Sequence, residues 1–369
     1  MKKVLHVIAG MNAGGMETMI MNFYRNLDRD KYQFDFLIND PNEVFFEKEI
    51  IDLGGHVYRA VPQRKNCFKN HKQVDDIIKQ GNYDAIHCHQ GITYYYPLKS
   101  AKKHGIKNRI VHNHGINRKF LKYLKVYNEL YAKKRICGLA NNYIACSKTV
   151  MNHIYTNKLI SSNKVILLPN AIDVKKYLYN SVKRIAIRKE LGIKKERVFI
   201  HVGTFTTPKN HFFLIDVFEK YLSIDPTSKL ILVGEGILKE EIISTVNKKG
   251  ISDNVIFTGV RKDIPDMLSA ADMLLFPSLY EGLPLTLIEA QANGIKIISS
   301  ENVSQETRIT DLIEYLPIDN IDSWVDKINQ ATFEYDRKKY NSELLKSDFS
   351  VKVTVKKLQK IYDNIGGKQ

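Results

Sequence analysis

The stretch that decides the fold is Phe276–Glu289, which reads FPSLYEGLPLTLIE. The apolar run Met273–Phe276 leads into it, and Pro277-Ser278 indicates that a strand ends there in a turn. Leu285–Ala292 then reads as a helix with a proline beside its first turn. A strand, a loop and a helix N-terminus in this order form the arrangement in which α/β folds bind anions and nucleotides.

Two carboxylates of this stretch carry its chemistry. Glu281 is expected at the mouth of the loop, and Glu289 about two turns inside the helix. In the context SLYEGLP, the pair resembles the E-x7-E motif of retaining glycosyltransferases of family 4, which have the two-domain GT-B fold. The resemblance implies that Glu281 lies beside a donor sugar and that Glu289 hydrogen-bonds the ribose of a nucleotide sugar. Read without it, they are a loop carboxylate and a solvated helix residue.

Length and composition favour two ordinary globular domains. The chain has 369 residues, of which 44% are apolar and 26% charged. The first ten residues, MKKVLHVIAG, are better explained by a buried first strand than by a signal peptide, and no apolar run could span a bilayer. Its four cysteines show no zinc-binding spacing. We therefore expect reduced thiols and a cytoplasmic protein.

The positive charge is concentrated in one segment. The net charge is +16, and residues 99–175 hold 16 Lys and Arg against Glu129 and Asp173. Within this segment, Lys119–Lys134 reads as a basic amphipathic helix. Together with the family resemblance, it predicts peripheral binding to the anionic inner face of the plasma membrane. A merely soluble basic face is the alternative, and nucleic-acid binding lacks any recognisable motif.

Strands and helices alternate along the whole chain, which predicts an α/β fold with parallel sheets. Strands are expected at residues 4–9, 34–38, 56–59, 85–88, 109–112, 143–146, 165–168, 198–202, 229–233, 255–258, 273–276 and 296–299. With the resemblance, this implies two Rossmann-like domains facing a cleft. We expect an acceptor-side domain at 1–175, a nucleotide-sugar domain at 176–350, and a last helix, beginning at Val351, that crosses back to the first domain.

The first half offers three candidate groups. Gly14 and Gly15 precede a helix and resemble the family's glycine loop, which faces the diphosphate and the acceptor, although a tight turn explains them as well. His114 matches the histidine that touches the donor sugar, with His112 as the alternative. The alternative is that this residue is a structural histidine held by hydrogen bonds. Two His-x-His pairs, at residues 87–89 and 112–114, suggest metal ligands but lack a third ligand in sequence reach, so we expect no metal.

The second half carries the expected diphosphate site. Residues 203–210, GTFTTPKN, resemble the family loop in which an Arg and a Lys clamp the diphosphate. Lys209 keeps the second cation, whereas Thr204 replaces the first. Arg261 follows a later strand and is expected to approach the phosphates instead. Backbone N–H groups near Gly15, Gly282 and Leu283 would add donors.

The resemblance implies a retaining hexosyltransferase that needs no metal or other cofactor. Glu281, His114 and Lys209 would carry catalysis. A UDP-sugar is the expected donor, and a glycan or lipid-linked saccharide of capsule or exopolysaccharide synthesis the expected acceptor. Two alternatives remain open: an epimerase or phosphorylase on the same fold, and a non-catalytic partner subunit, which the loss of the first cation at Thr204 would favour. The sequence leaves the donor, the linkage and the oligomeric state undetermined.

Overall fold

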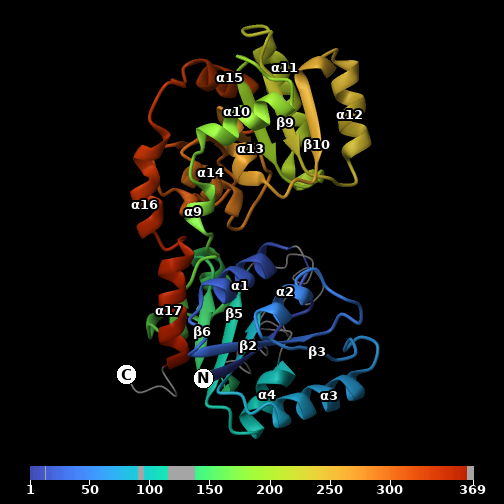
Figure 1. The fold of residues 1–369 in the computed structure, drawn as a ribbon, viewed down its shortest axis with the longest axis vertical. Helices are drawn as coiled ribbons and strands as arrows, with labels where there is room; N and C mark the ends of the chain where they lie inside the picture. The colour runs from blue at the N-terminus through green and yellow to red at the C-terminus, as the bar shows by residue number, and fades with distance from the viewer. Residues whose placement is uncertain (13, 90–94, 115–137, 364–369) are drawn as a thin grey trace. The chain divides into compact units, whose positions relative to one another are not determined.

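The computed structural model describes residues 1–12, 14–89, 95–114 and 138–363, and these form two compact units (Figure 1). Unit 1 comprises residues 1–171 together with 351–369, and unit 2 comprises residues 172–350. The chain therefore leaves unit 1 a few residues before the expected boundary at 175 and returns to it at Val351.

Unit 1 is built on a seven-stranded parallel sheet in the order β3-β2-β1-β4-β5-β6-β7. The strands are β1 (Lys2–Val7), β2 (Tyr32–Ile38), β3 (Val57–Arg59), β4 (Ala85–His89), β5 (Asn108–Asn113), β6 (Asn142–Ala145) and β7 (Val165–Leu167). The described helices are α1 (Gly15–Asn26), α2 (Glu47–Asp52), α3 (Cys67–Gln80), α4 (Tyr95–Lys103), α7 (Lys148–Ile154), α8 (Asn157–Ser161) and α17 (Val351–Asp363).

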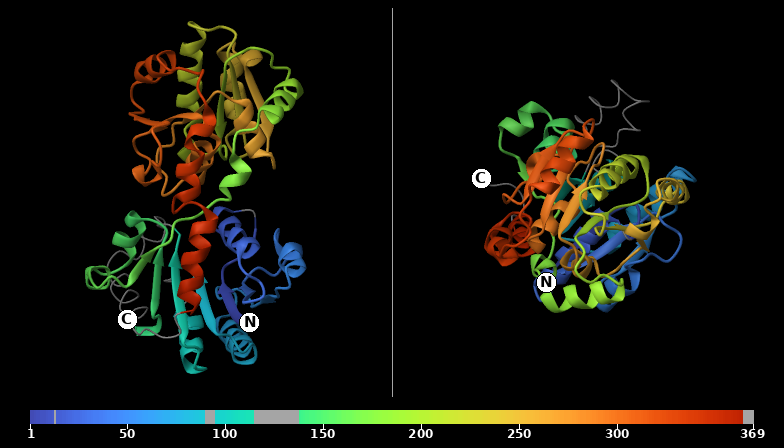
Figure 2. Two further views of the ribbon diagram at one scale, coloured as in Figure 1. Left: turned by 60° about the vertical axis from the view of Figure 1, so that its left-hand side comes forward. Right: turned by 90° about the horizontal axis from the view of Figure 1, so that it is seen from above.

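Side chains alternate between the two faces of this sheet, and each face has its own core. Val4 and Ile8 pack with α1 and α17, whereas Leu5 and Val7 pack with α3 and α4 on the other face. Figure 2 shows α17 lying alongside the strands of unit 1, and the element contacts place it against α1. The last described helix thus completes the core of the first unit.

Unit 2 repeats the plan with a six-stranded parallel sheet in the order β10-β9-β8-β11-β12-β13. Its strands are β8 (Val198–Val202), β9 (Lys229–Val233), β10 (Val255–Gly259), β11 (Met273–Phe276), β12 (Lys296–Ser300) and β13 (Ile313–Leu316). Its helices are α9 (Val174–Tyr177), α10 (Ser181–Glu190), α11 (His211–Leu222), α12 (Lys239–Lys248), α13 (Ile264–Ala270), α14 (Leu285–Asn293), α15 (Ile321–Asn329) and α16 (Asn341–Lys346). One core lies under α11, α12 and α15, and another under α10, α13 and α14.

Both sheets reverse their strand order at one point. In unit 1 the order runs outward in both directions from the neighbours β1 and β4, and in unit 2 from β8 and β11. The loops that leave two such neighbouring strands go to opposite sides, so they part at the carboxyl edge of the sheet and leave room for a ligand there. In unit 2, this rule predicts a ligand site at the loops that follow β8 and β11.

Candidate functional site

In unit 2, the loops after β8 and β11 are tied to each other at the point where the strand order reverses. The first loop ends in a 3-10 turn, Thr207–Lys209, which terminates at Asn210 with φ of 54°. The Asn210 side chain donates to the carbonyl of Pro277 at 3.2 Å, and the Leu279 amide donates to the carbonyl of Pro208 at 2.8 Å. The two loops therefore hold each other in place.

Lys209 and Glu281 meet between these loops. Lys209 Nζ lies 2.6 Å from Glu281 Oε1, and the two side chains are 18% and 21% exposed. The ammonium also lies 4.9 Å from the ring centroid of Phe276, the last residue of β11, which adds a cation–π contact. The backbone of Glu281 forms a bridge to Val303. Two groups expected separately from the sequence are thus one ion pair.

Two glycines allow the loops after β8 and β9 to approach each other closely beside this pair. Gly234 has φ of 142°, and a Cβ there would overlap the carbonyl oxygen of Gly203. A Cβ on Gly203 would lie 3.1 Å from the Lys209 side chain. The loop beginning at Gly203 is therefore pressed between the loop after β9 and the stem of Lys209. Thr204, which stands where a cation was expected, is exposed, and its hydroxyl lies 3.3 Å from that of Thr206.

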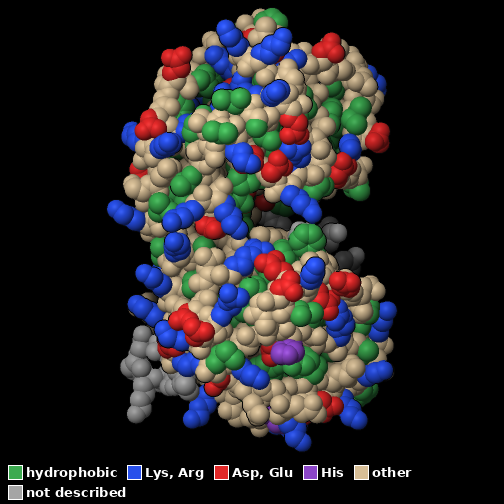
Figure 3. Space-filling view, in the orientation of Figure 1, with side chains coloured by type: hydrophobic (Ala, Val, Ile, Leu, Met, Phe, Trp, Pro, Cys, Tyr) green, Lys and Arg blue, Asp and Glu red, His purple; other side chains and the backbone are tan. Residues whose placement is uncertain are grey.

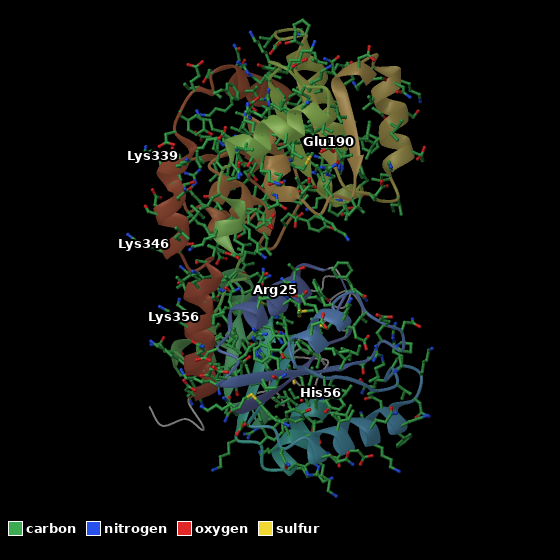
Figure 4. All side chains as sticks on the ribbon, viewed as in Figure 1. Arg25, His56, Glu190, Lys339, Lys346 and Lys356 are labelled. Atoms are coloured by element: carbon green, nitrogen blue, oxygen red, sulfur yellow. The ribbon has the colours of Figure 1, made fainter. Side chains whose placement is uncertain are left out.

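Arg261, the expected second cation, has other partners. Its guanidinium donates to Asp263 at 2.8 and 2.6 Å and to Glu190 at 2.7 and 3.4 Å. These two carboxylates raise the pKa of Arg261 further above its ordinary value. Glu190 ends α10 and is labelled in Figure 4. A phosphate would have to compete with both carboxylates for Arg261.

Glu289 lies on α14 and has a partner that the sequence reasoning missed. The hydroxyl of Tyr177, at the end of α9, donates to Glu289 Oε1 at 2.8 Å. Burial raises the pKa of Glu289 to about 7, and the Tyr177 hydrogen bond opposes that rise because it favours the charged form. No sequence signal linked the two residues, since they are far apart in the chain. Between the two carboxylates, Gly282 is exposed with open space around it, and Leu283 packs against an apolar cluster that includes Ile288.

In unit 1, Gly14 and Gly15 begin α1. Gly14 is the N-cap residue with extended backbone, and a Cβ added to Gly15 would meet no atom within 4 Å. Glu17 folds back toward Gly14, and burial raises the pKa of its carboxyl. The helix N-terminus therefore already has a carboxylate beside it, which a bound diphosphate would need to displace.

The expected catalytic histidine, His114, follows β5 and has both ring nitrogens occupied. Its Nε2 lies 2.9 Å from His89 Nδ1, and its Nδ1 lies 3.0 Å from Asn170 Oδ1. His112, the alternative, is fully buried. His-x-His lacked a third ligand in sequence reach, but the sheet brings histidines of separate strands together. Among the described residues, His6, His87 and His89 form one group of close nitrogens, and His89, His112 and His114 another.

The basic segment is only partly visible. The expected amphipathic helix Lys119–Lys134 lies outside the described residues. Figure 3 shows Lys and Arg intermixed with Asp and Glu on the viewed faces of both units. In the described part of the chain, no helix has both the length and the apolar character needed to cross a membrane.

Comparison with known proteins defines the class. The family model described as "Glycosyl transferases group 1" matches residues 183–342, and "Glycosyltransferase Family 4" matches residues 13–176. A relative named EpsF, from Bacillus subtilis (strain 168), is 32% identical over 83% of this chain and 80% of its own length. The chain therefore belongs to the family 4, group 1 glycosyltransferases.

Two further comparisons extend over nearly the whole chain. The capsular polysaccharide biosynthesis glycosyltransferase CapH of Staphylococcus aureus is 27% identical over 98% of this chain and 99% of its own. A crystal structure of Anabaena Alr3699/HepE in complex with UDP and glucose matches with a TM-score of 0.77, at 15% identity, over 99% of this chain and 100% of the other. The fold is GT-B, as the sequence predicted.

Proposed function

We propose that this glycosyltransferase moves a hexose from a UDP-sugar to a glycan or lipid-linked saccharide in capsule or exopolysaccharide synthesis, with retention of anomeric configuration. The observation that carries the proposal is the Lys209–Glu281 pair at the carboxyl edge of the unit 2 sheet. The name of CapH supports the pathway, and the UDP complex of Alr3699/HepE supports the donor class.

The ion pair supplies both charges that such a donor needs. As the anomeric C–O bond breaks, negative charge develops on the leaving diphosphate and positive charge on the sugar. Lys209 would stabilise the diphosphate, and Glu281 would hold sugar hydroxyls. A preorganised donor aimed at developing charge contributes roughly 3–4 kcal/mol. In the free protein each group neutralises the other, so the pair is held ready without an unpaired charge in a site that is four-fifths buried.

The proposal gives the remaining roles to other groups that the sequence singled out. Glu289, oriented by Tyr177, would accept hydrogen bonds from the ribose. Backbone N–H groups near Gly15 and Leu283 would add to the diphosphate site, and the leaving phosphate would deprotonate the acceptor hydroxyl. We propose that transfer needs no metal. Cytoplasmic location and binding of Lys119–Lys134 to an anionic membrane remain part of the proposal.

The first experiment is a thermal-shift screen of UDP, GDP, ADP and their common sugars. A ligand at 100 times its Kd stabilises the folded protein by about 2.7 kcal/mol. We expect UDP to stabilise the wild type and not the Lys209→Ala variant. Lys249→Ala is the matched control, because Lys249 also pairs with carboxylates in unit 2, Asp216 and Glu219, away from the pair.

Two outcomes would change the proposal. Stabilisation by GDP or ADP alone would replace the donor class. No response to any nucleotide would favour the non-catalytic partner subunit. Two features support that alternative: Thr204 carries no charge, and Arg261 is paired with carboxylates.

Glu281→Gln tests the chemistry directly. We expect sugar transfer to fall by at least the 10²–10³-fold typical of losing one such group, with the fold intact, because the amide lacks the negative charge with which Glu281 would hold the sugar hydroxyls as positive charge develops on the sugar. Turnover is measured as release of UDP in the presence of acceptor, and the melting temperature controls for folding. A variant with undiminished turnover would remove Glu281 from the mechanism.

A further inference from the structure

Four histidines share one face of the unit 1 sheet because of strand register and side-chain alternation. His6 on β1 is paired with His87 on β4, and His89 on β4 with His112 on β5. All four have no exposed surface and lie on the face that α1 and α17 cover. His114 follows two residues after His112. A row of imidazoles therefore runs through the core of unit 1 to the end of β5.

Three of these rings are joined edge to edge. His6 Nδ1 lies 2.8 Å from His89 Nε2, and the two ring planes differ by 11° with centroids 5.1 Å apart. His89 Nδ1 lies 2.9 Å from His114 Nε2, again with centroids 5.1 Å apart, at 25°. In each pair, the two nitrogens are much closer to each other than the two ring centroids are, so the nitrogens lie between the rings. Each contact is therefore an in-plane N–H···N hydrogen bond and not a stacking contact.

The chain of hydrogen bonds has one consistent direction. Asn170 presents its carbonyl oxygen to His114 Nδ1 at 3.0 Å, and a carbonyl oxygen can only accept. His114 must then carry its proton on Nδ1, which leaves Nε2 as an acceptor for His89 Nδ1–H, and His89 Nε2 in turn accepts from His6 Nδ1–H. The chain of hydrogen bonds ends at His6 Nε2, which is buried without a partner. The reverse direction would leave an N–H orphaned there, and orphaned buried donors are the rarer case in proteins.

A metal ion does not fit the same geometry. Zinc binds imidazole nitrogen at about 2.0–2.1 Å, so two nitrogens of one tetrahedral site lie roughly 3.3 Å apart and point at the ion. Here the nitrogens of each bonded pair are 2.8 or 2.9 Å apart and point at each other. An ion could enter only if the rings turned away from their hydrogen bonds.

We infer that His6, His89 and Asn170 are positioning residues that lock His114 in a single neutral form, with the proton on Nδ1 and Nε2 occupied. His114 then has no free ring nitrogen for a ligand and presents a fixed, uncharged ring at the end of β5. Burial lowers the pKa of His114 to about 4, in keeping with a neutral ring. That this ring lies beside the donor sugar is an expectation from the sequence and rests on the proposed glycosyl transfer; the locked tautomer does not depend on it.

The test is nitrogen NMR of protein labelled with ¹⁵N-histidine, because the ring nitrogens report which one bears the proton. We expect Nδ1–H and bare Nε2 for His6, His89 and His114 in the wild type. In Asn170→Ala, which removes the acceptor, the His114 nitrogens should shift toward the values of a tautomer mixture. Asn170→Asp keeps an acceptor and should preserve the wild-type pattern. Asn254→Ala is the matched control, since its amide caps backbone carbonyls in unit 2.

The wild-type spectrum decides the matter even if a variant folds poorly. Nε2–H on His114, or a His114 signal unchanged in Asn170→Ala, would overturn the inference. So would Zn²⁺ alone shifting all three histidines, because that result would make the row a metal site. None of these readings needs donor or acceptor, so the tautomer lock can fail while sugar transfer is confirmed, and the reverse.

Discussion

Lys209 and Glu281 show how the charged groups of the site depend on one another. Each side chain is about one-fifth exposed and has the other as its counter-ion. Removing one partner leaves an uncompensated, largely buried charge, whereas a nucleotide diphosphate would replace Glu281 at the ammonium and free the carboxylate for the sugar. On the proposed function, donor binding at Lys209 and the release of Glu281 would therefore be a single event.

Glu289 gives a prediction on pH at the scale of one residue. Its folded pKa of about 7 lies above the ordinary 4.5, so the folded protein binds the extra proton between these values. Its contribution to stability is complete below pH 4.5 and is lost as the pH rises through about 7. We expect the free energy of unfolding of the wild type to fall over this window relative to Glu289→Gln, which cannot titrate. Urea unfolding of both proteins at several pH values measures the difference.

Parallel curves for the two proteins would mean that Glu289 titrates alike in the folded and unfolded chain. Tyr177→Phe sharpens the test, because it removes a hydrogen bond that favours the charged form. In that variant the decline should extend to a higher pH than in the wild type.

At this scale the sequence identified groups but not their partners. The motif around Glu281 and the loop containing Lys209 could be found because each is defined by residues that are adjacent in the sequence. Tyr177 and Asn170 could not, because each meets its partner only after the sheets form. A hydrogen-bonded histidine was the alternative for His114, but its partners could not be named for the same reason. The two carboxylates that pair with Arg261 and would compete with a phosphate were likewise not identified from the sequence.

At the scale of elements, buried parallel strands were predicted well because they read as continuous apolar runs. The expected strands at 198–202, 229–233 and 273–276 have the observed bounds. β13, with the sequence IEYL, was missed because it is short and contains a charge. α11 was also missed. Its sequence HFFLIDVFEKYL is apolar around most of its surface, since it is largely buried, and so shows weak helical periodicity.

The packing of helix α17 on unit 1 can be tested by truncating one of its buried side chains. Leu358 is fully buried in the core that α17 shares with α1, so Leu358→Ala should destabilise unit 1 by about 2–5 kcal/mol. Lys356, exposed on the same helix and labelled in Figure 4, provides the control Lys356→Ala, which should stay within about 0.5 kcal/mol of the wild type. Urea unfolding followed by circular dichroism measures both. Equal stabilities would show that α17 is not part of the folding unit.

At the scale of the whole molecule, two units with separate cores can respond differently to acid. The five histidines of the row in unit 1 have lowered pKa values, including His6 at about 3 and His114 at about 4. Among the described residues of unit 2, His201 and His211 have lowered values. Burial disfavours the charged imidazole, so the stability these groups provide is present above pH 6.5 and is lost as the pH falls toward their folded values.

We therefore expect unit 1 to unfold at a higher pH than unit 2 during acidification. Trp324 is the sole tryptophan and lies buried in unit 2, so its fluorescence reports that unit alone. Circular dichroism reports both units. Ellipticity should fall before the Trp324 emission shifts in a pH series descending from about 8 to about 4. Coincident changes would contradict separate titration of the two units.

The overall plan was within reach of the sequence, because alternating strands and helices with family motifs in both halves predict two Rossmann-like domains. The structure divides the chain near residue 171 and returns α17 to unit 1. What the sequence left open is the interior of unit 1, since a histidine row appears only when β1, β4 and β5 are placed side by side.

The return of α17 has a consequence for how the chain is made. A ribosome releases residues 172–350, a continuous stretch that forms unit 2, before it releases the helix that completes unit 1. At about 5–20 residues per second, those roughly 180 residues take on the order of 10–35 s to synthesise. During that time the apolar surface of α1 and the histidine row lack their cover. The first unit to begin emerging is therefore the last to finish folding, because its core is complete only once α17 has been released.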